Sequence, residues 1–118
     1  MSGPTVSTHV LDACAGIPAG DVHVVLEGRA TDGSWEAAGR AVTDGDGRAR
    51  FPGNLAAGEY RLTFGTGAYF AARGTSSFYP EVTVTFSVAS GHYHVPLLLS
   101  PFAYSTYRGS LVARDCAR

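Results

Sequence analysis

Strict alternation of apolar and polar residues is the feature that most limits how this 118-residue chain can fold. Over residues 82–88 every second position is valine or phenylalanine, with threonine or serine between, and residues 60–64 repeat the pattern. Successive side chains of a β-strand point to opposite faces of its sheet, so each segment would have one apolar face and one polar face. Both segments are therefore predicted to be strands that cover a core on one side only.

Turns rich in glycine separate several further segments of β-type composition. The chain has 15 glycines, many of them beside Asp, Asn, Pro or Ser, which is typical of tight turns. Weaker strand candidates lie between these turns at 6–11, 22–26, 35–42, 95–99 and 103–107. Residues 67–73 differ, because they are rich in alanine, follow Thr66 as a candidate N-cap and end at Gly74, and they are predicted to form one short helix.

Seven or eight short strands with no helix between successive ones favour an all-β sandwich over βαβ units. Residues 1–118 are the right length for a single domain. Charged residues make up 16% of the chain, below the roughly 25% that is usual, and 45% of residues are hydrophobic. We therefore expect another copy to cover part of each subunit, in a homo-oligomer.

Charge, cysteine content and hydropathy exclude several classes of function and location. The formal net charge of −1 gives no electrostatic reason to expect nucleic acid or an anionic membrane as a partner. Cys14 and Cys116 stand near opposite ends and form no metal-type pair. The first nine residues lack the features of a secretory signal, and no apolar run is long enough to span a bilayer. The expectation is a soluble, cytoplasmic protein.

Two clusters near the end of the chain carry the residues best suited to chemistry. One contains His92 and His94, and the other is Tyr107-Arg108-Gly109-Ser110. Together they offer imidazoles, a phenol, a guanidinium and a hydroxyl, which are the groups that proton transfer onto a small polar substrate needs.

Each candidate also has a simpler interpretation. A lone His9 on a half-buried strand is more often structural or exposed than catalytic. Arg48, at the end of an Asp-Gly turn, is typical of an exposed arginine at the start of a strand, with Arg50 on the same face. His92 and His94 share a strand face and could bind one metal ion with His9 or His23 as a third ligand.

Six segments, in this order along the chain, resemble the 5-hydroxyisourate hydrolases, the transthyretin-related enzymes of urate breakdown. The terminal Tyr-Arg-Gly-Ser is the most specific of them, because it distinguishes these enzymes from transthyretin, the hormone carrier of the same fold. The segments are 7–12, 43–48, 66–70, 78–82, 93–101 and 104–110.

The resemblance implies a transthyretin-like sandwich of two four-stranded sheets with one short helix. It also implies a homotetramer, a dimer of dimers, with substrate sites in the channel where the dimers meet. Carried over by motif, the catalytic residues would be His9, Arg48, His94 and Ser110. Tyr107 would bind substrate together with His9, Arg48 and Ser110, and neither a metal nor another cofactor is implied.

The implied reaction is the hydrolytic opening of the pyrimidine-derived ring of 5-hydroxyisourate at an amide carbonyl. His9 or His94 would act as general base on water, and Arg48 would hold the oxyanion. Residues 111–118 extend beyond the serine at which family members usually stop, and this extension would be disordered, a reading-frame remnant or a gate. The alternatives are a non-catalytic transthyretin-like tetramer that binds a small ligand, and a metal-dependent hydrolase built on His92 and His94.

Overall fold

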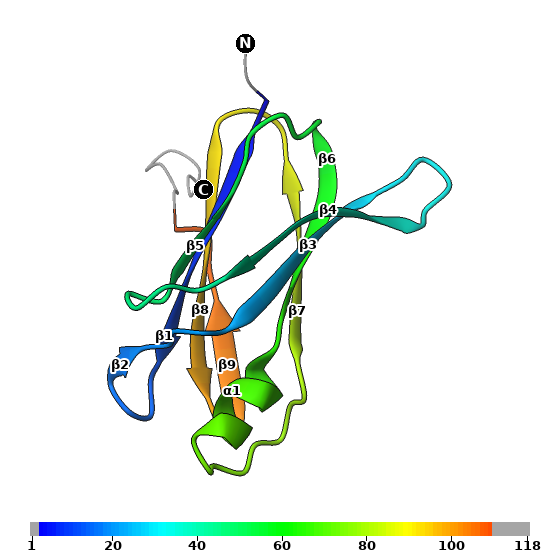
Figure 1. Ribbon diagram of the computed structural model, residues 1–118. Helices are drawn as coiled ribbons and strands as arrows, with labels where there is room; N and C mark the ends of the chain where they lie inside the picture. The colour runs from blue at the N-terminus through cyan, green and yellow to red at the C-terminus, as the bar shows by residue number, and fades with distance from the viewer. Residues whose placement is uncertain (1–2, 110–118) are drawn as a thin grey trace, which may run out of the picture.

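The computed structural model describes residues 3–109, which form two β-sheets and one short helix (Figure 1). The first sheet contains strands β1, β2, β5, β8 and β9, and the second contains β3, β4, β6 and β7. In chain order the elements are β1 (Thr5–Asp12), β2 (Ile17–Pro18), β3 (His23–Arg29), β4 (Trp35–Val42), β5 (Arg48–Phe51), β6 (Gly58–Phe64), α1 (Thr66–Ala72), β7 (Val82–Val88), β8 (His92–Ser100) and β9 (Ala103–Thr106).

The first sheet has the order β2-β1-β8-β9, and β5 also pairs with β1. Strands β1 and β8 run parallel to each other, and the other pairs of this sheet are antiparallel. Strand β8 takes one edge of β1 along its whole length, so β5 and the two-residue β2 share successive parts of the other edge. The prediction was a sheet of four strands. The observed sheet has five, because β2 and β5 lie end to end beside β1. The second sheet, β4-β3-β6-β7, is antiparallel throughout.

Alternate residues of the central strands fill the space between the sheets. Val10, Leu26, Leu62, Phe64 and Leu97 are all completely buried. Burying one side chain of this kind stabilises the fold by roughly 1.5–3 kcal/mol. The period of two that sends these residues inward sends their neighbours on the same strands outward. The outer face of the first sheet is therefore free to carry polar side chains.

The single helix in the described part of the chain, α1, packs at one end of the sandwich (Figure 1). The buried Tyr69 hydroxyl donates a hydrogen bond of 2.8 Å to Oδ2 of Asp12 at the end of β1. Thr66 was expected to be the N-cap, but Gly65 holds that position, and the Thr66 hydroxyl donates instead to the carbonyl of Tyr79, 3.4 Å away. Thr66 is buried, which directs its side chain toward this loop.

The structure confirms the predicted all-β sandwich with one short helix. Strands 35–42 and 82–88 have the predicted bounds, whereas β3 and β8 are longer than expected. Within residues 3–109, no helix is long and apolar enough to cross a bilayer. Ser110 and the extension 111–118 lie outside the described residues.

Candidate functional site

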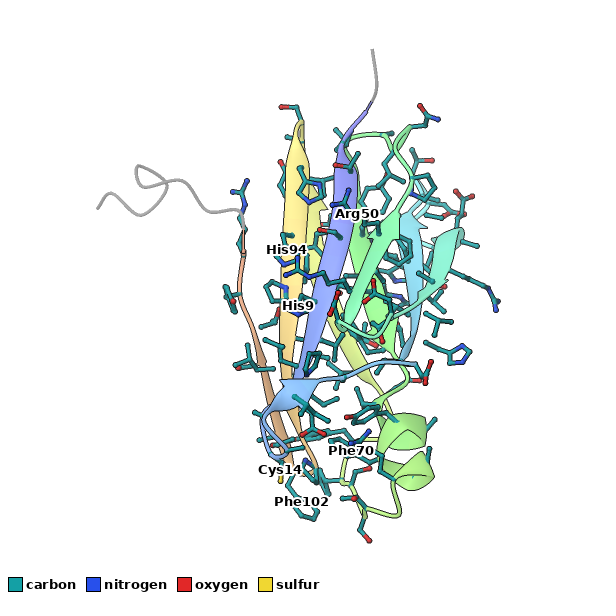
Figure 2. The ribbon with its side chains drawn as sticks, turned by 60° about the vertical axis from the view of Figure 1, so that its left-hand side comes forward. His9, Cys14, Arg50, Phe70, His94 and Phe102 are labelled. Carbon is teal, nitrogen blue, oxygen red and sulfur yellow. The ribbon has the colours of Figure 1, made fainter. Side chains whose placement is uncertain are left out.

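Three adjacent strands of the first sheet present polar side chains on the face opposite the core. Ser7 on β1 is directly opposite Arg50 on β5 and His94 on β8. Two residues further along β1, His9 is opposite Arg48 and Pro96. Directly opposite residues of paired strands point to the same side of the sheet. Figure 2 shows His9, Arg50 and His94 along these strands.

A hollow of about 300 Å³ lies over this part of the sheet. Its walls carry two guanidinium groups and two imidazoles, and none of the described residues that line it is Asp or Glu. Such a lining favours a ligand rich in oxygen atoms or carrying negative charge. The lining residues are Ser7, Thr8, Arg48, Ala49, Arg50, His92, His94 and Gly109.

The Ser7 hydroxyl lies between the two histidines of β8. Its Oγ is 2.8 Å from Nε2 of His92 and 2.8 Å from Nδ1 of His94. On its other side, Nδ1 of His92 is 2.6 Å from Oγ1 of Thr5. Ser7 is only 7% exposed. The bond to Ser7 engages Nδ1 of His94 and leaves Nε2 for water or substrate.

His9 is held by the loop that precedes β5. Its Nε2 donates a hydrogen bond of 2.9 Å to the carbonyl oxygen of Asp46. A carbonyl can only accept, so Nε2 carries a hydrogen and Nδ1 is the nitrogen left for other contacts. The loop itself is fixed by Asp44, whose Oδ1 accepts hydrogen bonds from the backbone N–H groups of Asp46 and Arg48 at 2.9 and 3.0 Å. These bonds, that of Arg48 first, hold the pKa of Asp44 below its usual value.

Gly47 allows this loop to approach β1 closely. Its φ is 77°, and a Cβ at this position would collide with the carbonyl oxygen of Val10. Only glycine combines that backbone conformation with that proximity at little cost. The Asp-Gly turn therefore places Arg48 opposite His9.

Burial and nearby positive charge favour the neutral form of His94. Desolvation is the largest cause that lowers its pKa below 6.5, and His9, His92 and Arg48 add to it in that order. Both effects disfavour a second proton on the imidazole. A neutral, half-buried histidine beside a guanidinium is suited to take a proton from a water molecule.

Tyr107 lies in a neighbouring hollow rather than beside Arg48. That second hollow, of about 270 Å³, is lined by residues 84, 86 and 87 of β7, 93–95 of β8 and 106–108, so His94 lines both hollows. Tyr107 is 58% exposed. The next residue but one, Gly109, returns to the first hollow. Ser110 lies outside the described residues, so its place at the site stays a prediction.

The structure thus brings His9, Arg48 and His94 onto one face from three strands and adds Ser7, Arg50 and His92. Of these, Ser7 was not singled out from the sequence, although it shares a strand face with His9. The contact of Ser7 with His92 and His94 depends on the parallel pairing of β1 with β8, and no local sequence pattern indicates that pairing. Among residues 3–109 no group of three or more His, Cys, Asp or Glu side chains is arranged to hold a metal ion.

Comparison with known proteins places the chain in a well-defined group. The family model described as "HIUase/Transthyretin family" matches residues 6–109. A 5-hydroxyisourate hydrolase of Salmonella dublin is 47% identical over 110 residues, which cover 89% of this chain and 80% of that protein.

Two solved structures have the same fold. The 5-hydroxyisourate hydrolase of Klebsiella pneumoniae superposes with a TM-score of 0.82 at 40% identity, covering 91% of this chain and 99% of that one. Transthyretin from Sparus aurata superposes with a TM-score of 0.84 at 35% identity, covering 87% and 94%.

Proposed function

The chain belongs to the HIUase/transthyretin family and is a 5-hydroxyisourate hydrolase of urate degradation. We propose that His9, Arg48 and His94 carry out its reaction. Ser110 completes the catalytic set, and Tyr107 and Ser110 help to bind the substrate. The observation that carries this proposal is the convergence of His9, Arg48 and His94 from three separate strands on one face of the sheet.

His94 acts as the general base. Its lowered pKa favours the neutral imidazole, whose Nε2 takes a proton from water as the water oxygen attacks a ring amide carbonyl of 5-hydroxyisourate. The carbon–nitrogen bond then breaks as the proton held by His94 is delivered to the leaving nitrogen, and the water oxygen stays on the carbonyl carbon. His9 orients the water or relays that proton. The product is 2-oxo-4-hydroxy-4-carboxy-5-ureidoimidazoline.

Arg48 stabilises the negative charge that develops on the carbonyl oxygen during the attack. Its guanidinium is permanently charged and offers several N–H donors in a fixed plane. Because it is opposite His9 and lines the same hollow as His94, its guanidinium is available to an oxyanion that forms beside the two imidazoles. Such preorganised donors are often the largest single contribution to catalysis.

The subunit is proposed to work as a homotetramer, a dimer of dimers, in the cytoplasm. The low charged fraction supports association, as do aromatic side chains left open on the subunit, with Phe78 70% and Phe102 68% exposed. The substrate hollow would then lie in the channel between dimers. Sedimentation of the purified protein at working concentration tests this part, and a monomer contradicts it.

The activity is tested by following the ultraviolet decay of freshly generated 5-hydroxyisourate with and without the protein. The variants His9→Asn and His94→Asn should each slow the catalysed decay strongly. His23→Asn is a matched control, because His23 is an exposed histidine of the second sheet. Undiminished activity in both His9→Asn and His94→Asn would end the proposal. The proposed steps use no metal, so chelator-treated protein should keep its full rate.

A further inference from the structure

The Ser7 hydroxyl is the link between the catalytic imidazole and the second histidine of β8. Resting on the proposed function of His94, we propose that Ser7 is a positioning residue that acts together with His92. The pair holds His94 in the tautomer with its hydrogen on Nδ1, so that Nε2 is bare and can accept the proton of water.

The counting of hydrogens limits the possible arrangements to two. A serine hydroxyl has one hydrogen and here has two imidazole neighbours at 2.8 Å, so with both rings neutral it donates to one and accepts from the other. In the first arrangement His94 Nδ1–H donates to Ser7, Ser7 donates to His92 Nε2, and His92 Nδ1–H donates to Thr5. In the second, every bond is reversed and Nε2 of His94 carries the hydrogen.

Only the first arrangement leaves His94 able to act as a base through Nε2. The hydrogen-bonded chain is built into the sheet, because the parallel register sets Ser7 opposite His94 and Thr5 opposite His92. Ser7 itself is buried, whereas His92 is exposed. The hydrogen-bonded chain therefore runs from a half-buried base to an exposed histidine.

The remaining groups that face His94 cannot replace Ser7 as the acceptor of a hydrogen bond from its Nδ1–H. The arginines that line its two hollows, Arg48, Arg50 and Arg108, can only donate. His9 influences His94 through its charge, but its own Nε2 is committed to the Asp46 carbonyl. Among the described residues, Ser7 is the group bonded to Nδ1 of His94.

The tautomer can be measured directly in the full-length protein. The chain has four histidines, so ring ¹⁵N chemical shifts from two-bond ¹H–¹⁵N spectra can be assigned with single His→Gln variants. In the wild type we expect the His94 hydrogen on Nδ1. Ser7→Ala should move it to Nε2 and lower kcat by roughly 10- to 100-fold with little change in KM, because positioning is lost while substrate contacts remain.

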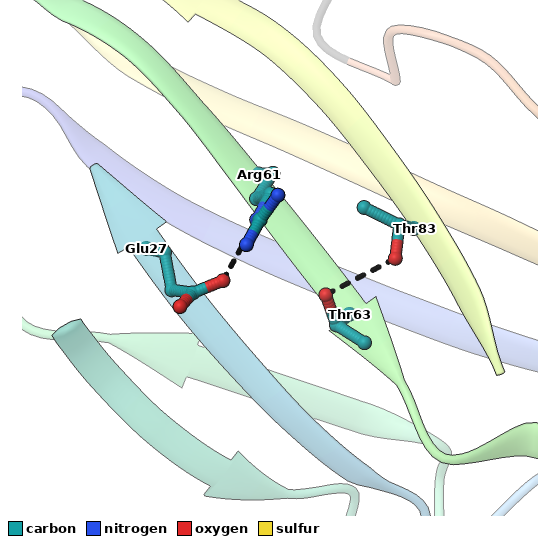
Figure 3. Close-up of polar contacts among 4 residues, drawn as sticks. All are labelled: Glu27, Arg61, Thr63 and Thr83. Carbon is teal, nitrogen blue, oxygen red and sulfur yellow. Dashed lines mark hydrogen bonds and ion pairs between the residues drawn. The ribbon is translucent and has the colours of Figure 1, made fainter. Parts of the chain in front are cut away.

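Two further variants and one control separate positioning from simple loss of stability. Ser7→Thr keeps the hydroxyl, so it should show the wild-type tautomer and kcat. His92→Gln should move the acid limb of the pH profile of kcat to higher pH, because His92 helps to lower the pKa of His94. Thr83→Ala is the matched control, since it also removes a cross-strand hydroxyl bond, that of 3.2 Å to Thr63 on the outer face of the other sheet (Figure 3). Its kcat and His94 spectrum should match the wild type.

The outcomes also separate this inference from the function on which it rests. A wild-type His94 with its hydrogen on Nε2 would overturn the inference, and so would a Ser7→Ala variant with unchanged kcat and tautomer. If the wild type fails to hydrolyse 5-hydroxyisourate, the proposed function fails and the inference about the base fails with it. The ¹⁵N spectra then still decide whether Ser7 sets the tautomer.

Discussion

The backbone N–H of Gly109 donates a hydrogen bond of 2.8 Å to the carbonyl oxygen of His94. This bond lays the end of the described chain against the imidazole, and a Cβ at position 109 would lie only 2.5 Å from Cδ2 of His94. Cδ2 is bonded to Nε2, the nitrogen proposed to accept the proton of water. The glycine of the Tyr-Arg-Gly-Ser segment is therefore required by the distance between backbone and ring.

Gly109→Ala should lower kcat by roughly 10- to 100-fold, since either the ring or the chain end must move away from its productive position. The exposed position should leave the free energy of unfolding within about 0.5 kcal/mol of the wild type. Steady-state kinetics and denaturant unfolding measure the two quantities.

Gly65→Ala provides the matched control for that substitution. A Cβ at Gly65, with φ of −78°, would make ordinary contacts of 3.7 and 3.8 Å with His23. This variant should keep full activity and change the free energy of unfolding by no more than about 1 kcal/mol, because the lower entropy of the unfolded chain offsets the loss of a favourable N-cap residue. Equal activity of the two alanine variants would show that Gly109 does not constrain His94.

The sequence predicts most of the fold because its strands are short and their periodicity is local. The alternating segments at 60–64 and 82–88 need only their own residues to reveal an apolar face, and both are strands. The two-residue β2 could not be predicted, since it exists only by pairing with Leu11 and Asp12. Gly65 replaced Thr66 as the N-cap because Thr66 is buried against the loop before β7.

The sequence indicated candidate residues for the site. It did not indicate which of their side chains are in contact with one another. His9, Arg48 and His94 were identified from motifs, and strand geometry alone places Arg50 beside Arg48. The contact of Ser7 with His94 spans 87 positions of the chain and depends on a parallel pairing. Local periodicity carries no information about which strands become neighbours.

The pH dependence of hydrolysis should reflect the lowered pKa of His94. The base must be neutral, so kcat/KM should fall on acidification only below pH 6.5, the usual value for histidine. The same shift makes the unfolded chain bind more protons than the folded one in that range, so stability should also decline as the pH falls through it. An acid limb centred above pH 6.5 would assign the base to another group.

Arg48 and Arg50 should affect different steps of hydrolysis, catalysis and substrate binding, although they line the same hollow. The Arg48 charge acts on His94 and its residue is opposite His9, so Arg48→Gln should lower kcat/KM by roughly 10- to 100-fold, as expected for a lost charged hydrogen bond. Arg50→Gln should mainly raise KM, since its charge attracts the substrate without stabilising the reacting oxygen. Equal losses of kcat in the two variants would contradict this division.

Tyr69→Phe should destabilise the fold while leaving hydrolysis intact. The buried Asp12 carboxylate would lose its 2.8 Å hydrogen bond from Tyr69 and keep those from the backbone N–H groups of Cys14 and Ala15, so the expected loss is about 1–3 kcal/mol. Tyr60→Phe is a matched control, because it removes a hydroxyl bond to the Ala56 carbonyl and involves no charge.

Alkaline unfolding tests the hydrogen bond between Tyr69 and Asp12. Burial, with the hydrogen bond to Asp12 second, raises the pKa of Tyr69 from 10.0 to about 12. A raised tyrosine pKa means that the folded chain retains a proton that the unfolded chain has lost, so this contribution is complete below pH 10 and disappears as the pH rises through about 12. The stability difference between wild type and Tyr69→Phe should therefore shrink across that interval in denaturant titrations. A constant difference would show that the phenol of Tyr69 ionises equally easily in both states and that the bond to Asp12 does not hold its proton.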